Sequence, residues 1–535
     1  MEDTPGLPEE SPSPSGASRR FLPGWMLKPF QFVSLAFLTQ GVLLLNQIVL
    51  LPIQIRIWGT EITAYWYSTL AVAAVTTAAD FGLRTAGHAE LIRFVHDSSD
   101  REARTDFEHL WAWIRILIAS TTFLLVAVDF IYNHFYLGAA YPLWRPALLI
   151  GIALEILIVV RVMYLDTLGL YREAEAGYLI LAAARLFLAV GALLFFHAPP
   201  ATLAWIWFFT GIFSIAQQGR ISRRLGLLRL FEPIPRDLSF KSLAITRHTM
   251  ADPCSSWVRI NGPVVILTVI APAAAITTYV ALRAVFGAAR TTISQLSRYA
   301  SVEYLTLRQS RRFDLAEIQI TLCVLLAAFF ASGITVAVLA DNGRIASLLL
   351  RKVDGALYQE MAITFGLGSA FYSYQIMQAV IRRAGEVARI ANRQYVYMLC
   401  SVVFAIVALV TKSTLLWLVL SLLADIMISV SFLLKTSRES IQSQTSAGWR
   451  GCVAAAASSL LVLAIWLVAR FENFGFLRET TASAIACTVV FLLLWLLLIA
   501  AVDFCLVYGL LAAKMSPVGS LVERLRSLRT AQTAK

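Results

Sequence analysis

The sequence predicts an all-α polytopic membrane protein, with about fourteen transmembrane helices in two pseudo-repeated lobes around a central cavity. Of the 535 residues, 58% are hydrophobic and only 15% are charged. A soluble chain carries about 25% charged residues, so this composition excludes an ordinary soluble domain. The apolar stretches are continuous rather than alternating, which excludes a transmembrane β-barrel.

About fourteen stretches are long and apolar enough to cross a bilayer. They lie near 31–54, 62–83, 110–132, 144–168, 175–197, 200–218, 243–270, 273–299, 316–340, 359–381, 392–411, 414–434, 449–470 and 483–509. Several of them contain charges or prolines, so about twelve spans is the alternative count.

The spans group into segments of different composition. The predicted segments are a disordered tail at 1–24, an N-terminal lobe of about six spans at 25–218, a basic cytoplasmic linker at 219–242, a C-terminal lobe of about six spans at 243–440, two additional spans at 441–512, and a basic cytoplasmic tail at 513–535. Pro233 and Pro235 interrupt the linker, which makes it the natural boundary between the lobes.

The basic residues predict the orientation. The chain holds 45 lysines and arginines against 33 acidic residues, a formal net charge of +12. They concentrate in alternate connections, for example at 84–104, 220–241 and 382–393, whereas the connections near 133–142 and 197–200 hold none. By the positive-inside rule, both termini are predicted to be cytoplasmic, and the charge excess needs no nucleic-acid partner.

A faint internal repeat supports the two lobes. Residues 51–70 and 262–282 each contain a proline, an aliphatic helix end, a short turn and a tyrosine in the returning helix. Transporters built from parallel repeats hold their substrate between the two halves.

The first pair of spans carries a family resemblance. Its marks are Leu51–Pro52, Trp58–Gly59–Thr60–Glu61, Tyr65–Trp66 and Asp80–Phe81–Gly82–Leu83. This run resembles the opening of bacterial polysaccharide flippases, the Wzx-type O-antigen and exopolysaccharide exporters of the multidrug/oligosaccharidyl-lipid/polysaccharide exporter superfamily. The second glycine of the family pattern is missing, because Tyr65 is followed directly by Trp66. The start of the second half, with Gly262–Pro263, Tyr279, Arg283 and Ser301–Val302–Glu303–Tyr304, is also similar to the family.

The resemblance implies a V-shaped bundle in the bacterial inner membrane that works by alternating access. Its substrate would be a polyprenyl-pyrophosphate-linked oligosaccharide, for lipopolysaccharide or exopolysaccharide synthesis, moved to the outer leaflet. No soluble segment is long enough for a nucleotide-binding domain, so the expected energy source is an ion gradient or the substrate gradient itself. A glycan polymerase or ligase is expected as a partner by analogy only. A monomer, the lipid bilayer as environment and no cofactor are also expected.

Four arginines in two neighbouring spans are the candidate site for the pyrophosphate. An arginine near the bilayer centre costs at least about 2.5–3.5 kcal/mol. Arg259 and Arg283 lie near the middle of their spans, and Arg283 and Arg290 share a helix face. Arg247 lies nearer the cytoplasmic end. The alternative is that these arginines snorkel or pair with acids such as Asp252 and Glu303.

Asp252 and His248 are candidates for ion coupling. They lie four residues apart, and Arg259 follows seven residues later, so all three are predicted on one side of a helix that Pro253 breaks or kinks. The alternative is a charge network that neutralises Arg259. Asp80 is a candidate gating residue, because Arg84 lies four residues later and predicts a helical ion pair.

Polar side chains also mark the N-terminal lobe. Asn46, Gln47 and Gln54 form a polar stripe on the first span, a candidate for contacts with sugar hydroxyls or for helix packing. Glu155, Arg161 and Asp166 in the fourth predicted span and Arg185 in the fifth are expected in an acid–base network. Arg115 and Asp129 in the third predicted span could join it.

No sequence motif indicates catalysis, so the chain is predicted not to be an enzyme. The six cysteines lack metal-ligand spacing, and no metal site is predicted. Two alternatives stay open: a multidrug antiporter of the same superfamily, whose cationic substrates favour acids, and a membrane-embedded glycan polymerase, ligase or glycosyltransferase.

Overall fold

The computed structural model describes residues 24–96, 100–131, 144–167, 171–224, 246–309, 313–341, 355–383 and 387–431, with a few residues of 234–243. Every regular element in these ranges is a helix. The two additional spans predicted at 441–512 and both predicted tails, apart from the first residue of the first helix, lie outside the described residues.

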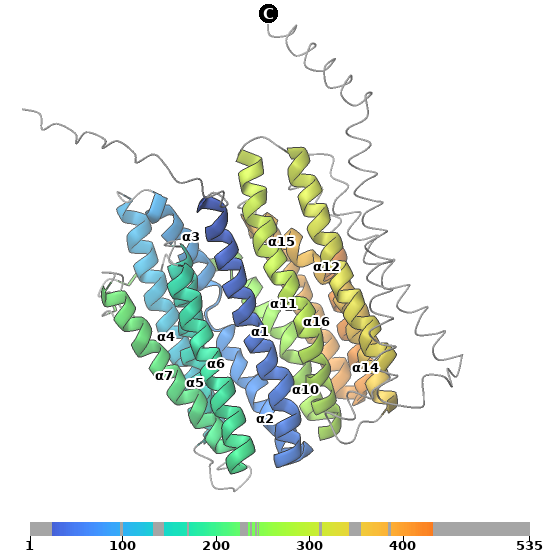
Figure 1. The fold of residues 1–535 in the computed structure, drawn as a ribbon. Helices are drawn as coiled ribbons and strands as arrows, with labels where there is room; N and C mark the ends of the chain where they lie inside the picture. Colours follow the sequence, from blue (N-terminus) through green and yellow to red (C-terminus); the bar gives the residue numbers. More distant parts are fainter. Residues whose placement is uncertain are drawn as a thin grey trace, which may run out of the picture.

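The first half of the chain forms a bundle of long helices (Figure 1). Its elements are α1 (Gly24–Trp58), α2 (Thr60–Ala73), the 3-10 helix η1 (Ala74–Thr77), α3 (Leu83–His96), α4 (Arg101–Ile131), α5 (Trp144–Thr167), α6 (Tyr171–Phe196) and α7 (Pro200–Arg224). Helix α7 continues to Arg224, so the first residues of the predicted linker are helical.

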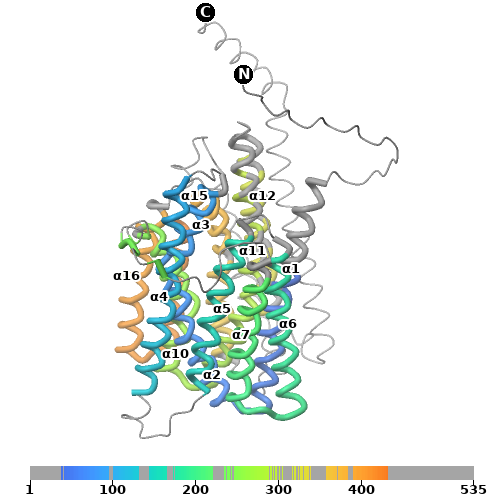
Figure 2. Tube along the Cα trace, turned by 90° about the vertical axis from the view of Figure 1, so that its left-hand side faces the viewer, coloured from blue at the N-terminus to red at the C-terminus, as the bar shows by residue number. Residues whose placement is uncertain are grey.

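The second half forms another bundle beside the first. Its elements are η3 (Thr246–His248), α9 (Ala251–Ile260), α10 (Gly262–Ile270), α11 (Ala273–Gln309), α12 (Phe313–Asp341), α14 (Gly355–Ala370), η4 (Phe371–Ser373), α15 (Tyr374–Arg383), α16 (Val387–Thr411) and α17 (Thr414–Ser431). The axes of most helices in both bundles are roughly aligned with one another (Figure 2).

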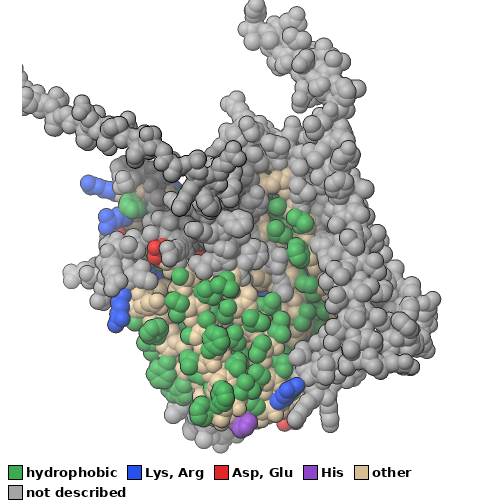
Figure 3. All heavy atoms as spheres, in the orientation of Figure 1, with side chains coloured by type: hydrophobic (Ala, Val, Ile, Leu, Met, Phe, Trp, Pro, Cys, Tyr) green, Lys and Arg blue, Asp and Glu red, His purple; other side chains and the backbone are tan. Residues whose placement is uncertain are grey.

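The surface of the described helices is that of a membrane protein. Within the described residues, 8 helices are long and apolar enough to cross a bilayer. Large side chains such as Phe187, Phe195 and Phe196 are 74%, 81% and 80% exposed, which is costly in water and favourable in lipid. Hydrophobic side chains cover most of one described face, while basic ones lie towards its ends (Figure 3). The predicted all-α polytopic membrane fold is confirmed.

Each lobe has its own apolar core. In the N-terminal lobe, the core includes Trp66, Leu110, Ile114 and Leu148, where α5 packs on α7 and α4 packs on α3. In the C-terminal lobe, a separate core forms where α11 packs against α12 and α15. Most buried apolar residues of each half therefore pack within that half, and a third cluster joins the two.

The segments of the internal repeat meet at the boundary between the lobes. The hairpin of α1 and α2 packs against the hairpin of α10 and α11. Leu51 and Ile55 of the first hairpin share an apolar cluster with Val264 and Leu267 of the second. The Ser68 and Thr268 hydroxyl oxygens lie 2.8 Å apart across this boundary. The two lobes are therefore joined by equivalent parts of the repeat.

The seventh predicted span is discontinuous, but Pro253 does not break it as expected. Pro253 lies in the first turn of α9, where its missing N–H has no helical partner to lose. The interruption comes at Asn261, between α9 and α10, and Pro263 lies at the start of α10. The break leaves carbonyl groups at the end of α9 that need hydrogen-bond donors from elsewhere.

The second predicted span also ends irregularly. After η1, the chain turns through Phe81 and Gly82, whose φ angles are 43° and 75°. A Cβ atom on Gly82 would lie 2.3 Å from the carbonyl carbon of Thr249, so only glycine fits. This turn of the N-terminal lobe therefore rests directly on the backbone that enters α9.

Candidate functional site

A cavity of about 350 Å³ lies between the two lobes. Helices α1, α2, α5 and α7 line one side, and the Asn261 interruption, α10 and α11 line the other. Its polar lining consists of Asn46, Gln47, Gln54, Tyr67, Thr77, Arg84, Glu155, Asn261 and Arg283. The cavity thus combines amides, one carboxylate and two arginines within an apolar bundle.

The predicted polar stripe of α1 faces this cavity. Asn46, Gln47 and Gln54 all line it. Gln54 is 1% exposed, and its Oε1 atom has no hydrogen-bond partner among the described residues. The Oδ1 atom of Asn46 is also buried without one. A Cβ atom on Gly287 of α11 would lie 3.8 Å from the Gln47 Oε1 atom, so this side chain reaches the opposite lobe.

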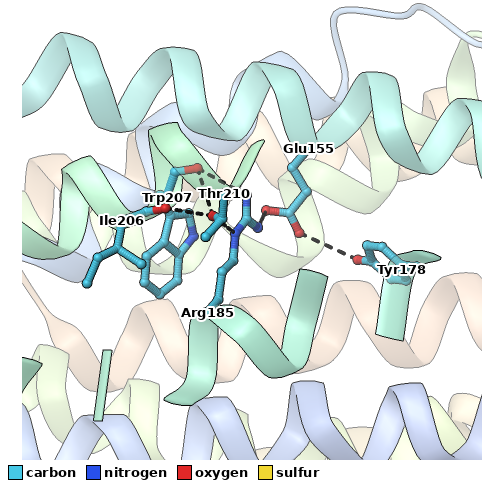
Figure 4. A network of polar contacts seen from close by, with 6 residues as sticks. All are labelled: Glu155, Tyr178, Arg185, Ile206, Trp207 and Thr210. Atoms are coloured by element: carbon cyan, nitrogen blue, oxygen red, sulfur yellow. Dashed lines mark hydrogen bonds and ion pairs between the residues drawn. The ribbon is translucent and has the colours of Figure 1, made fainter. Parts of the chain in front are cut away.

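Glu155 of α5 lines the cavity. Polar contacts with neighbouring helices hold its carboxylate in place (Figure 4). Its carboxylate forms an ion pair with Arg185 of α6, which is only 4% exposed. The Arg185 Nε atom donates a hydrogen bond of 3.0 Å to the Thr210 hydroxyl, and its guanidinium lies over the Trp207 ring. The Tyr178 hydroxyl donates a long bond of 3.5 Å to Glu155. Of the expected acid–base network, the Glu155–Arg185 pair is present, whereas Asp129 pairs with Arg145 instead.

Arg283 of α11 is the candidate arginine that lines the central cavity. Its Nη1 atom donates a hydrogen bond of 2.9 Å to the carbonyl oxygen of Ile260. That carbonyl belongs to the last turn of α9, just before the interruption, so Arg283 supplies a donor that the broken helix lacks. Arg283 forms no ion pair with a described carboxylate.

Arg259 and Arg290 lie behind Arg283 rather than in the central cavity. The three arginines line a small pocket together with Tyr279 and Tyr372. Arg259 also lines a neighbouring pocket of about 60 Å³ in the C-terminal lobe, and its guanidinium lies 5.4 Å from the Tyr374 ring. The side chain of Arg247, the fourth candidate, lies outside the described side chains.

The C-terminal pocket beside Arg259 contains an acid of α17. The Tyr397 hydroxyl donates a hydrogen bond of 3.1 Å to Asp425, which forms no ion pair with any described arginine. The hydroxyls of Ser401 and Ser421 line the same pocket and have no hydrogen-bond partner in the described structure. A polar space of this size holds a few water molecules.

Asp252 has different partners from those predicted. It forms an ion pair of 2.6 Å with Arg382 of α15, not with Arg259. Gln378 and Gln394 donate bonds of 2.9 Å and 2.7 Å to its Oδ1 atom. Sequence spacing gave no signal for these three partners, because they lie on α15 and α16, more than a hundred residues later.

His248 does not share a helix with Asp252. It lies in η3, is exposed, and is separated from α9 by a turn, so the four-residue spacing does not bring the two side chains together. His248 therefore does not belong to the predicted common face, because the α-helix begins only at Ala251, whereas Asp252 and Arg259 both lie on α9, seven residues apart.

Asp80 does pair with Arg84, although not within a helix as predicted, because Asp80 lies in the turn before α3. The carboxylate is buried, and its Oδ2 atom lies 3.4 Å from the Arg84 Nε atom. The Gly82 backbone N–H donates to the other carboxylate oxygen at 3.2 Å, which stabilises the turn. Since Arg84 also lines the central cavity, this pair lies at the cavity wall.

No known family profile and no curated protein match the sequence. Solved structures do match. A structure of the lipid II flippase MurJ, in an inward closed conformation, has a TM-score of 0.60 and 12% identity, over 89% of this chain and 99% of that chain. A MATE structure in the straight conformation has a TM-score of 0.58 and 13% identity, over 78% and 97%. An inward-facing multidrug resistance MATE transporter of the MOP superfamily has 0.51 and 12%, over 82% and 99%.

The chain has the fold of MOP-superfamily transporters. The solved proteins that share this fold with it are transporters rather than enzymes. At 12–14% identity, these likenesses concern the fold alone. The resemblance to Wzx-type exporters is narrower and stays a prediction.

Proposed function

We propose that this chain is a flippase that moves a polyprenyl-pyrophosphate-linked oligosaccharide across the bacterial inner membrane. The observation that supports this most is Arg283, an arginine without a described carboxylate partner in the wall of an interlobe cavity. An unpaired guanidinium in a membrane bundle is costly, and a bound pyrophosphate would neutralise it through charge-assisted hydrogen bonds.

Alternating access fits the division into two lobes. Rocking of the lobes about the seam between the α1–α2 and α10–α11 hairpins would open the cavity to one side of the membrane at a time. The arginines behind Arg283 add positive potential to the same wall. The similarity in fold to a structure described as a lipid II flippase is consistent with a lipid-linked substrate.

The finer parts of the proposal come from the sequence. The glycan is proposed to be an O-antigen or exopolysaccharide unit, with sugar contacts from Asn46, Gln47 and Gln54. Both termini are proposed to be cytoplasmic, and transport is proposed to be coupled to an ion gradient. Asp80, with its partner Arg84 at the cavity wall, is the proposed gating residue.

A multidrug antiporter is the second candidate, and Glu155 is the observation that favours it. A carboxylate in the cavity would attract a cationic drug, and MATE structures share the fold. However, Arg185 already neutralises Glu155, whereas no described acid neutralises Arg283. The balance of charge in the cavity therefore favours an anionic substrate.

Reconstitution in proteoliposomes tests the proposal. The substrate is a fluorescent polyprenyl-pyrophosphate sugar, and the readout is its movement between leaflets, with product analysis to detect any new glycosidic bond. We expect the wild type to move the lipid unchanged, Arg283→Gln to be at least about tenfold slower, and Arg283→Lys to retain part of the rate.

Arg161 of α5 gives the matched control, because it is a buried arginine of a membrane helix that does not line the cavity. Arg161→Gln should leave the rate within about twofold of wild type. Export of a cationic dye without any lipid movement would instead support the antiporter, and a new glycosidic bond would support an enzyme.

A further inference from the structure

The N-terminal wall of the cavity offers hydrogen-bond acceptors without partners. The Gln54 Oε1 and Asn46 Oδ1 atoms are buried, line the cavity and have no partner among the described residues. A buried polar atom without a partner is destabilising by about 1–3 kcal/mol, so such atoms call for a ligand or water. Both atoms accept hydrogen bonds and cannot donate them.

Glu155 adds a third acceptor at the same wall. Its side chain is 26% exposed, while its partner Arg185 is 4% exposed and does not line the cavity. The ion pair therefore presents its negative end to the cavity and keeps its positive end in the protein. One carboxylate oxygen contacts Arg185, and the other receives only the long bond from Tyr178, so it can accept a further donor.

The opposite wall of the cavity supplies a positively charged hydrogen-bond donor in place of acceptors. Arg283 of α11 is a donor, and Gln47 extends across the cavity to within reach of Gly287, one turn further along the same helix. A substrate with an anionic end and a neutral end rich in O–H or N–H donors would match both walls. A pyrophosphate followed directly by a sugar has this chemistry.

We infer that the wall formed by Asn46, Gln54 and Glu155 is a subsite for the first sugar of the glycan. It would bind that sugar through hydroxyl or amide N–H donors, and the Glu155 carboxylate would exclude a sugar that carries a carboxylate of its own. This inference rests on the proposed flippase function and adds a specificity-determining residue, Glu155, to it. Like charges placed together at a desolvated site oppose binding, which is the basis of the selectivity.

The experiment compares three lipids in proteoliposomes: polyprenyl pyrophosphate without sugar, the same lipid with one neutral hexose, and the same lipid with the matching hexuronic acid. We expect the wild type to move the hexose lipid at least about tenfold faster than the hexuronic lipid. Gln54→Met, which keeps the side-chain length but removes the acceptor, should slow the hexose lipid about fivefold and leave the sugar-free lipid unchanged.

Glu155 is tested by a charge-neutral pair of substitutions, because removing it alone would leave Arg185 buried and unpaired. The double variant Glu155→Gln with Arg185→Gln should move the hexuronic lipid several-fold faster, relative to the hexose lipid, than the wild type does. Gln218→Met is the matched control, because Gln218 is a buried glutamine of the same lobe outside the cavity lining. It should change none of the three rates.

The two proposals fail in different ways. If the wild type moves none of the three lipids, the proposed flippase function is contradicted. If it moves the hexose and hexuronic lipids equally well, or if Gln54→Met slows all three lipids by the same factor, the sugar subsite is overturned while the flippase function stands.

Discussion

The two lobes differ in how the arginines within their membrane helices are paired with carboxylates. In the N-terminal lobe, Arg185 pairs with Glu155, and Arg145 pairs with Asp129 at 2.7 Å. In the C-terminal lobe, Arg259, Arg283 and Arg290 converge on one small pocket, and none of them forms an ion pair with a described carboxylate. Arg161 of the N-terminal lobe is also buried without an ion pair to a described carboxylate, but it does not line the cavity, so the contrast lies in the cluster of three unpaired arginines beside the cavity.

The difference suggests a division of labour. The N-terminal wall is neutral overall and offers fixed acceptors, so it suits the uncharged part of a substrate. The C-terminal wall holds surplus positive charge and suits an anion. If this comparison holds, equivalent substitutions in the two lobes should have opposite effects on stability.

The largest expected effect is at the N-terminal pair. Glu155→Ala leaves the Arg185 guanidinium buried without its carboxylate, so we expect a loss of about 3–5 kcal/mol in the free energy of unfolding. The measurement is thermal unfolding of the purified protein in detergent. The double variant Glu155→Gln with Arg185→Met removes both charges and should recover most of the loss. A double variant as unstable as Glu155→Ala would contradict the ion pair as the cause.

An intermediate effect of opposite sign is expected in the C-terminal lobe. Arg290→Met replaces an arginine that has no described carboxylate partner with an apolar side chain of similar length. We expect the free energy of unfolding to rise by about 1–2 kcal/mol, while the rate of lipid flipping falls. Both quantities are measured on one preparation. Destabilisation by Arg290→Met would show that this arginine is a structural residue and would remove the contrast between the lobes.

The smallest effect is expected at Asp252. Arg382→Gln removes an ion pair whose side chains are 35% and 26% exposed, and Gln378 and Gln394 still donate to the carboxylate. Solvent screening limits the loss to about 1 kcal/mol in the free energy of unfolding. Urea or thermal unfolding in detergent provides the measurement, and the rate of flipping should stay within about twofold of wild type. A large loss of flipping with little loss of stability would make Asp252 a coupling residue after all.

Local patterns in the sequence predicted local structure well. Within the described residues, the predicted apolar stretches form helices, and Asp80 and Arg84 form an ion pair, because both features depend only on neighbouring residues. The segments at 51–70 and 262–282 became equivalent hairpins that pack on each other. The polar stripe of Asn46, Gln47 and Gln54 faces the cavity, as one of its two interpretations required.

Contacts between helices that are distant in the sequence could not be predicted from residue spacing. Arg382, Gln378 and Gln394 reach Asp252 only because α16 packs on α9 and α15 packs on α16, and no spacing encodes that packing. The sequence grouped Arg259 with Arg283, and the two do line one small pocket, but only Arg283 also lines the interlobe cavity. His248 was misplaced because a helix was assumed where the chain forms a 3-10 turn.

The turn at Gly82 bears on how the two lobes would separate in the proposed alternating-access mechanism. There, one main chain rests on another with no side chain between them, and a single added methyl group would overlap Thr249. If the lobes rock as proposed, this contact between two main chains could open and close without a change of side-chain rotamer. A methyl group at that position would keep the two backbones apart and would favour the conformation of the proposed transport cycle in which this end of the molecule is open.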